Sequence, residues 1–317
     1  MTAIAILHPM NLLGKELRET LERLPRVGGD IRLLSTREDD IGTLTEVAGS
    51  AALVTRYEPE TLKGVGVAFF CGSMAENRPI LAEMPPETVA ILLSFDATLE
   101  DGHPVVAGVN TDDAPGHRVL LSPHPGAVLL AHLLHALREL ELSEAVATLV
   151  QPASMRDEPG IEELFEQTRQ IVAMTRRQPT PVFGAQLSFN LLPTPLSADL
   201  VAAQLSAVLA GAPPSPPVAL QILQGAVFHS VSASLYVRCG GDPSVQAIRK
   251  ALSGHVHLEA ADKPRLFGPV DAAASDKVLY GSVRKDEAGG GFWLWAAMDN
   301  LTRGGALNAI EIAAAVS

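Results

Sequence analysis

Residues 118–142 read RVLLSPHPGAVLLAHLLHALRELEL, and this stretch decides the fold. Its apolar run at 119–121 predicts a strand, and the leucines at 129, 133, 137 and 140 predict a helix with one apolar face. Residues 122–126 form a rigid turn between them. Many α/β enzymes hold a nucleophile at such a turn, because a helix N-terminus favours negative charge. Here Pro125 is central, with neither a reactive group nor a backbone N–H, and Ser122 is the only hydroxyl, with no recognisable base beside it.

Short apolar runs on both sides of this stretch indicate two sheets. The first part of the chain predicts helices at 14–24 and 80–84 between strands at 3–7, 31–34, 65–70 and 89–93. Such alternation is typical of a doubly wound parallel sheet, whose ligands bind at the carboxyl ends of the strands. The later part predicts hairpin-like connections between strands at 145–150, 218–223, 226–237, 278–284 and 292–298. We therefore expect an α/β fold whose second sheet is mixed or antiparallel, with helices on one face.

Composition excludes several classes of partner. The 317 residues carry a net charge of −12 without a cluster of lysines and arginines, which argues against nucleic acid and anionic membranes. No uncharged apolar run approaches the roughly 18 residues of a membrane span. Cys71 and Cys239 are the only cysteines, so no disulfide framework is expected and a cytoplasmic location is the simplest interpretation.

The first strand-to-helix turn, residues 8–14, reads HPMNLLG. A dinucleotide site needs glycines at the places of His8 and Asn11, for a tight turn and for close approach of the pyrophosphate. Only Gly14 remains, and the Cβ of His8 and the ring of Pro9 would obstruct a phosphate. The turn is therefore either a retained structural feature or a weakened cofactor site. The segment 35–37 (STR) suits a ribose 2′-phosphate, but a helix cap would look the same.

Two further groups of residues carry side chains that could take part in chemistry. Cys71 follows a strand and is either a reactive thiol or a small core residue. His132 and His135 are three residues apart on the predicted helix, and His255 and His257 alternate on what we expect to be a strand. Neither histidine pair has a carboxylate or cysteine at a recognised ligand spacing, so we expect packing or solvated histidines and no metal site.

The segment 299–310, DNLTRGGALNAI, resembles the closing signature of the aspartate-semialdehyde dehydrogenase family, usually DNL..GAALNA. The same order is followed by LKGVGVAFFCGS at 62–73, PVVAGVN at 104–110, IEELFEQT at 161–168 and LSFNLLP at 187–193. The resemblance covers essentially the whole chain. It implies an NAD(P)-binding Rossmann-like domain of residues 1–121 and 300–317, a dimerisation and substrate domain of residues 122–299, a homodimer, and a place in amino-acid biosynthesis.

The family's chemistry needs a cysteine thiolate, a histidine that moves protons and an NADP molecule. The resemblance places the Asn-Cys pair of the family on His124-Pro125, so Pro125 takes the nucleophile position. The family's first arginine falls near Thr98, and its Glu and Lys pair falls near Gln204 and Ala207. Its second arginine and its histidine fall on Gln224 and Val231 if the segment VFHSVS aligns without a gap; a local shift would restore the histidine at His229 but put Ile222 in place of the arginine. Gln151 is retained, and His229 would share the strand face of Val231. The implied cofactor contacts are Leu13, Gly14, Ser35, Gly72, Ser73 and Asn300.

Three functional interpretations follow. The first is a non-catalytic or repurposed dimeric homologue from a divergent branch that lacks the catalytic cysteine, with an unknown small-molecule ligand. Loss of a covalent nucleophile removes on the order of 10⁶-fold in rate, and NADP binding would be weakened or lost. The second is an NADP-dependent semialdehyde oxidoreductase with altered chemistry that uses Cys71 or His229. The third is a small-molecule sensor that keeps part of the nucleotide site.

Overall fold

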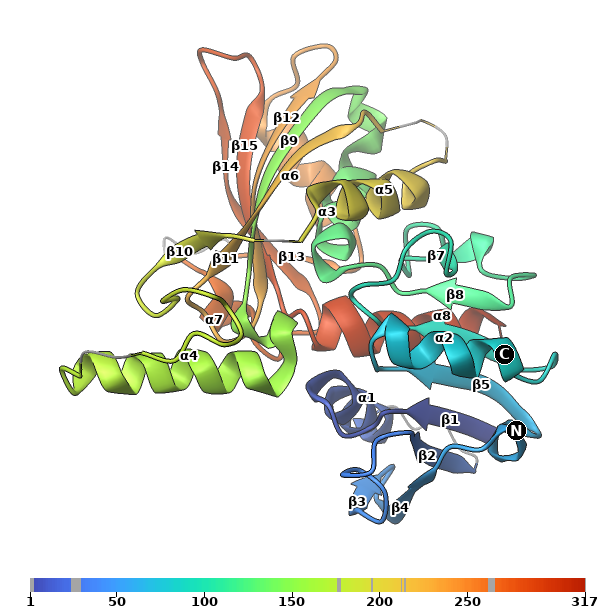
Figure 1. Ribbon diagram of the computed structural model, residues 1–317. Coiled ribbons are helices and arrows are strands. Elements are labelled where there is room, and N and C mark those ends of the chain that lie inside the picture. Colours follow the sequence, from blue (N-terminus) through green and yellow to red (C-terminus); the bar gives the residue numbers. More distant parts are fainter. Residues whose placement is uncertain are drawn as a thin grey trace. The chain divides into compact units, whose positions relative to one another are not determined.

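The computed structural model describes residues 3–316 except 24–29, 176–177, 195, 212, 214 and 262–265. The chain divides into two compact units, Met1–His124 with Gly305–Ser317, and Pro125–Gly304 (Figure 1). Each unit is built around one sheet. None of the helices in the described part of the chain is long and apolar enough to cross a membrane.

The first unit contains a mostly parallel sheet in the order β3-β4-β2-β1-β5-β6-β8-β7. Its strands are β1 (Ala3–Leu7), β2 (Ile31–Ser35), β3 (Leu44–Val47), β4 (Ser50–Arg56), β5 (Val65–Phe70), β6 (Val89–Leu92), β7 (His103–Pro104) and β8 (Val119–Leu121), and its helices are α1 (Leu12–Arg23), α2 (Met74–Glu83) and α8 (Asn308–Val316). Strand β3 alone among these runs antiparallel to its neighbour, β4. The hairpin of β3 and β4 was not predicted from the sequence.

The second unit contains a mixed, mostly antiparallel sheet in the order β10-β11-β9-β12-β15-β14-β13. Its strands are β9 (Leu142–Gln151), β10 (Leu191–Pro193), β11 (Val218–Gly225), β12 (Val231–Cys239), β13 (Leu258–Ala260), β14 (Val278–Lys285) and β15 (Phe292–Met298). Its helices are α3 (Pro125–Leu137), α4 (Asp157–Val172), α5 (Ala198–Val208), α6 (Val245–Ser253) and α7 (Pro269–Ala272). Helix α3 contacts α5, α6 and β12 and is buried along almost its whole length. The predicted fold class is confirmed for both sheets.

Two predicted strand segments are wrong. Residues 226–230 form a loop rather than the start of a strand, because Ser230 adopts a left-handed conformation (φ 73°) that ends extended pairing. Carbonyl groups of this loop accept the backbone N–H groups of Ala153 and Ser154 instead. His255 and His257 lie in a turn that precedes β13, not on a strand. His229 consequently shares no strand face with Val231.

Candidate functional site

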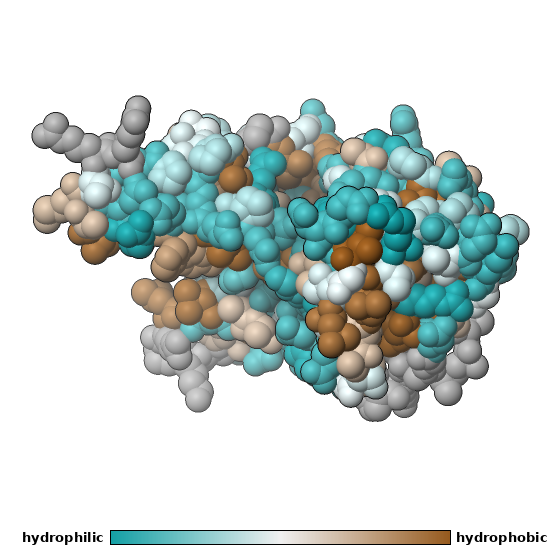
Figure 2. All heavy atoms as spheres, turned by 60° about the horizontal axis from the view of Figure 1, so that its bottom comes forward, coloured by the Kyte–Doolittle hydropathy of each residue, from teal (hydrophilic) through white to brown (hydrophobic). Residues whose placement is uncertain are grey.

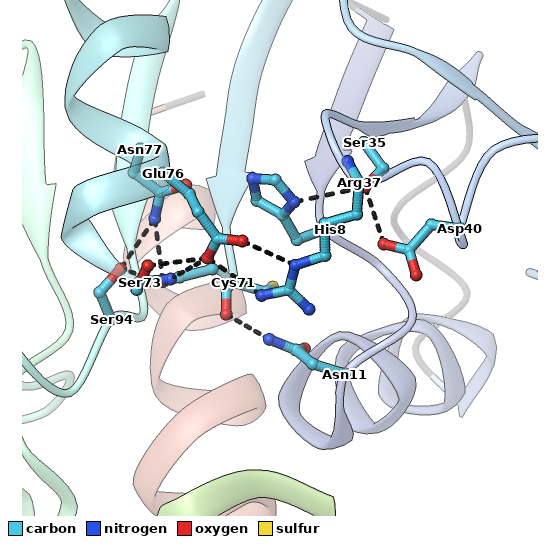
Figure 3. A network of polar contacts seen from close by, with 11 residues as sticks. His8, Asn11, Ser35, Arg37, Asp40, Cys71, Ser73, Glu76, Asn77 and Ser94 are labelled. Carbon is cyan, nitrogen blue, oxygen red and sulfur yellow. Dashed lines mark hydrogen bonds and ion pairs between the residues drawn. The ribbon is translucent and has the colours of Figure 1, made fainter.

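The first unit has its candidate site at the carboxyl ends of β1, β2 and β5, where a parallel sheet binds ligands (Figure 3). His8 follows β1 with φ 57°, the left-handed conformation that a glycine would normally supply. Its side chain is fully buried. A Cβ added at Gly72 would lie 2.5 Å from His8 Cδ2, so the ring packs directly on the loop after β5.

The hydrogen bonds around His8 define its tautomer. Ser35 Oγ donates to Asp40 Oδ2 at 2.7 Å and accepts the backbone N–H of Arg37 at 3.1 Å. The single hydroxyl proton of Ser35 is used by the carboxylate, so Nδ1–H of His8 must donate to Ser35 Oγ, at 3.3 Å. Nε2 then carries a buried lone pair without a hydrogen-bond partner. Burial lowers the pKa of His8 and keeps its ring neutral at neutral pH.

A bidentate ion pair lies beside the ring. Arg37 Nε and Nη2 donate to the two carboxylate oxygens of Glu76 at 2.7 and 3.0 Å. Glu76 also accepts the backbone N–H and the hydroxyl of Ser73, at 2.9 and 2.8 Å, which forms a capping box at the start of α2. Arg37, followed by these Ser73 bonds, lowers the pKa of Glu76 to about 2, although partial burial opposes the shift. The arginine of the predicted 2′-phosphate segment is therefore engaged by an internal carboxylate.

Both helix N-termini that face the sheet ends are satisfied by side chains of the protein. Asp96 accepts the backbone N–H of Met74 in the first turn of α2. At α1, Asn11 Oδ1 accepts the N–H of Gly14 at 2.7 Å, and the Asn11 amide donates to the carbonyl of Cys71. Anions bind at helix N-termini through these donors. Their occupation by internal oxygens leaves fewer of them for a phosphate.

The predicted cofactor residues in this unit have structural roles. A Cβ at Gly14 would come within 2.8 Å of the Pro9 backbone, so only glycine allows α1 to approach the turn. Leu13 is buried in the core. Ser35, Gly72 and Ser73 all belong to the network around His8 and Glu76 described above. Sequence analysis missed Glu76, although the Ser-x-x-Glu spacing of residues 73–76 is a recognisable capping box.

The turn before α3 carries little reactive chemistry. Pro125 begins α3 and fits there because the first helical residue needs no N–H donor. In the first unit, the Ser122 hydroxyl accepts from Asn308 Nδ2 at 2.9 Å. His124 is buried with its ring edge-on to Phe95, and burial lowers its pKa to about 4. A neutral imidazole and a hydroxyl bonded to an amide remain at the turn.

In the second unit, the retained Gln151 lies beside Gln224, the predicted replacement of a substrate arginine. Gln151 Nε2 donates to Gln224 Oε1 and to Thr194 Oγ1, both at 3.0 Å. Gln224 Nε2 donates back to the Gln151 carbonyl at 3.1 Å, and Gln204, on α5, is fully buried. These amides are uncharged, so they cannot supply the charge that an arginine would bring to an anionic substrate.

The remaining candidates are Asn300, His229 and the two cysteines. Asn300 is tied within the second unit, where Oδ1 accepts Ser230 N–H at 2.9 Å and Nδ2 donates to Ser154 at 3.0 Å. His229 lies in the loop before β12. Cys71 is buried after β5, and burial raises the pKa of Cys239, at the end of β12, to about 11.

The structure brings together the two histidine pairs that the sequence suggested separately. His132 contacts the rings of His255 and His257, with centroids 5.1 and 5.0 Å apart, and His135 contacts His255 at 5.7 Å. Across the residues that the structure describes, no group of three or more histidine, cysteine or acidic side chains is arranged to hold a metal ion.

These features define a class: a two-unit α/β protein with a Rossmann-type N-terminal sheet. Its fold matches "a probable aspartate-semialdehyde dehydrogenase from Pseudomonas aeruginosa", with a TM-score of 0.90, 23% identity, and coverage of 99% of this chain and 97% of that one. In sequence it is 29% identical to a USG-1 protein homolog of Azotobacter vinelandii and 24% identical to an aspartate-semialdehyde dehydrogenase of Bacillus subtilis (strain 168). Each alignment covers 98% of this chain and 96% of the relative.

The chain is thus a homologue of aspartate-semialdehyde dehydrogenases and USG-1 proteins, and the similarity extends over nearly all of its residues. No family model matches it.

Proposed function

We propose that this chain is a non-catalytic, dimeric homologue of aspartate-semialdehyde dehydrogenase whose dinucleotide pocket is filled by its own side chains. The observation that carries the proposal is His8. Its fully buried ring rests on Gly72 in the place where a dinucleotide site leaves room for pyrophosphate. NADP does not fit these residues as they stand, because its phosphates would have to displace the imidazole from β1 and β5.

Electrostatics oppose the cofactor as well. Glu76 stays ionised and holds the Arg37 guanidinium in two hydrogen bonds. A 2′-phosphate would have to break this pair and accept a negative carboxylate as a neighbour. Asp96 adds a second carboxylate at the N-terminus of α2. A pocket with two internal acids in these positions favours its own closed state over an anionic ligand.

The reaction would also lack its chemical groups. By the resemblance, Pro125 takes the nucleophile position and Gln224 takes that of a substrate arginine. No cysteine offers a ready substitute, because Cys239 has a pKa of about 11 and Cys71 is buried. His229 lies in a loop, without the predicted strand neighbour. This argues against the alternative, an NADP-dependent oxidoreductase that uses Cys71 or His229.

Dimerisation rests on the homology and on exposed apolar side chains. Phe165, Phe189 and Leu191 in the second unit are 60%, 72% and 52% exposed. Figure 2 shows apolar side chains that reach the surface among hydrophilic ones on one face. Large exposed apolar side chains are typical of protein interfaces.

Calorimetric titration of the full chain with NADP and with NAD tests the proposal. We expect no saturable binding in the wild type. The double variant His8→Gly/Asn11→Gly is titrated beside the wild type as the matched comparison, because it restores both missing glycines and opens the loop. Micromolar binding of NADP to the wild type, or phosphate-dependent oxidation of aspartate semialdehyde at enzyme-like rates, would overturn the proposal. Light scattering should give twice the mass of one chain, and a monomer would refute the dimer.

A further inference from the structure

Four histidines of the second unit meet where helix α3 packs near the turn between α6 and β13. His132 and His135 lie one helical turn apart on α3, so their side chains share a face. His255 and His257 lie in the turn, with their ring centroids 5.8 Å apart. The interplanar angle of 71° between His132 and His255 indicates an edge-on contact between the two rings.

The cluster offers few hydrogen bonds to its most buried member. His132 is fully buried, and neither of its ring nitrogens has a hydrogen-bond partner. Nε2 of His255 is also buried without one. Buried polar atoms without partners are uncommon and costly, on the order of 1–3 kcal/mol each. These ring nitrogens would gain hydrogen bonds if a conformational change exposed them to water.

The charged groups that face the cluster are mostly positive. Arg303 is buried and its Nη1 donates to Nδ1 of His257 at 3.1 Å, which requires that nitrogen to be unprotonated. Arg138 acts on His135 and His255. Among the residues that the structure describes, Glu139, beside His135, is the one acidic side chain that acts on any of the three rings with shifted pKa values. Each protonation would place a new positive charge beside Arg303, Arg138 or another imidazole.

These surroundings hold the rings neutral. Burial, followed by Arg303 and the other histidines, lowers the pKa of His132 well below its ordinary value. Burial and His257 lower the pKa of His255 to about 4. Burial also lowers the pKa of His135, with Arg138 adding to the shift. Once exposed to water, such a histidine would return toward the ordinary value of 6.5 and take up a proton in mild acid.

We propose that the four histidines form an acid-sensitive joint, by which we mean a packing contact that opens on protonation. It holds the turn of residues 254–257 and strand β13 against α3 at neutral pH and releases them in mild acid. The turn is the side that moves, because α3 is buried within the unit whereas β13 is a short strand at the edge of the sheet. Strand β13 is paired with β14 over only Leu258–Ala260. Few backbone hydrogen bonds therefore oppose its release.

Hydrogen–deuterium exchange of the full chain tests the joint. Amides of residues 254–260 are compared at pH 7.5 and pH 5.0 after correction for the intrinsic exchange rate. A histidine whose pKa rises from about 4 to 6.5 on opening shifts the opening equilibrium by at most about 30-fold between these pH values. Because His255 is partly exposed, we expect a rise on the order of 10-fold in this segment. Peptides from β5 and β12 should change much less.

Variants distinguish the joint from general acid unfolding. His255→Phe keeps a ring in the turn but cannot take up a proton, so it should reduce the acid-induced rise, while His132 and His135 keep their part of it. His117→Phe is the matched control, because it removes one ring of the stacked pair of His103 and His117 in the first unit. Should His255→Phe fold poorly, the wild-type exchange profile still decides. Equal exchange of residues 254–260 at both pH values, or an unchanged rise in His255→Phe, would overturn the proposal.

Discussion

The packing of His8 on Gly72 makes a quantitative prediction about Gly72→Ala. A Cβ at this position would lie 2.5 Å from His8 Cδ2 and 3.0 Å from Glu76 Oε2. The carboxylate is the end of a flexible side chain, but the imidazole is enclosed and must move by about 1 Å to restore normal contact. Overpacking of this kind typically costs about 1–3 kcal/mol. We expect Gly72→Ala to lower the free energy of unfolding by about 2 kcal/mol.

A double-mutant cycle in urea tests whether His8 is the cause. Of the three atoms nearest to the new Cβ, a His8→Gly background leaves only the Glu76 carboxylate oxygen, which lies at the end of a flexible side chain. The cost of Gly72→Ala should therefore fall below about 1 kcal/mol. The coupling between the two sites is then about 1–2 kcal/mol, well above the error of additivity. Gly211→Ala is the control, because nothing lies within 4 Å of its added Cβ. Additive effects at residues 8 and 72 would refute the reasoning that the ring fills the pocket.

Three further predictions concern other parts of the chain. Burial lowers the pKa of His124 to about 4, so the stability that the neutral ring contributes to the fold is complete above pH 6.5 and is lost as the pH falls toward 4. Phenylalanine cannot take up a proton. His124→Phe should therefore reduce the loss of unfolding free energy between pH 7.5 and 4.5 by about 2–3 kcal/mol. Gly304→Ala should destabilise the protein by about 1–3 kcal/mol in the same urea assay, since its Cβ would lie 2.7 Å from Met298 Cε and 2.9 Å from Pro125 Cβ; an unchanged midpoint would contradict this contact. Cys239, with a pKa of about 11, should react with a disulfide reagent at pH 7.5 at least 10-fold more slowly in the folded chain than in urea, and equal rates would show that the thiol is accessible.

Much of the fold could be predicted from local sequence pattern. Apolar runs such as residues 65–70 and 292–298 form strands because each must be buried on one or both faces. The beginning of β12 could not be predicted in this way. Residues 226–228 are as apolar as a strand requires, but Ser230 adopts a left-handed conformation and the loop pairs with Ala153 and Ser154. That choice depends on a segment more than 70 residues away in the chain.

The candidate sites show the same division. The glycine-poor turn led to the prediction that His8 would obstruct a phosphate, because the argument needs only the local backbone and one side chain; this stays a prediction, and the structure shows the His8 ring buried against Gly72. The sequence did not reveal the bidentate partner of Arg37, since Glu76 lies 39 residues away. The histidine cluster was missed for a similar reason. His132 meets His255 only because α3 packs against α6 and the turn after α6 leads into β13, a tertiary arrangement that residue spacing does not encode.

The backbone of the first turn argues that the buried position of His8 is part of the folded architecture. A histidine with φ 57° costs roughly 1–2 kcal/mol relative to an ordinary conformation. Such strain persists only where the surroundings enforce it. Here α1 approaches so closely that Gly14 has no room for a Cβ, which keeps the tight turn, and Ser35 and Gly72 hold the ring. A turn that had merely lost its ligand would be free to relax to a negative φ. His8 instead combines the glycine-like backbone with a side chain that occupies the pocket, so opening the site to a dinucleotide would disturb packing that holds β1, β2 and β5 together.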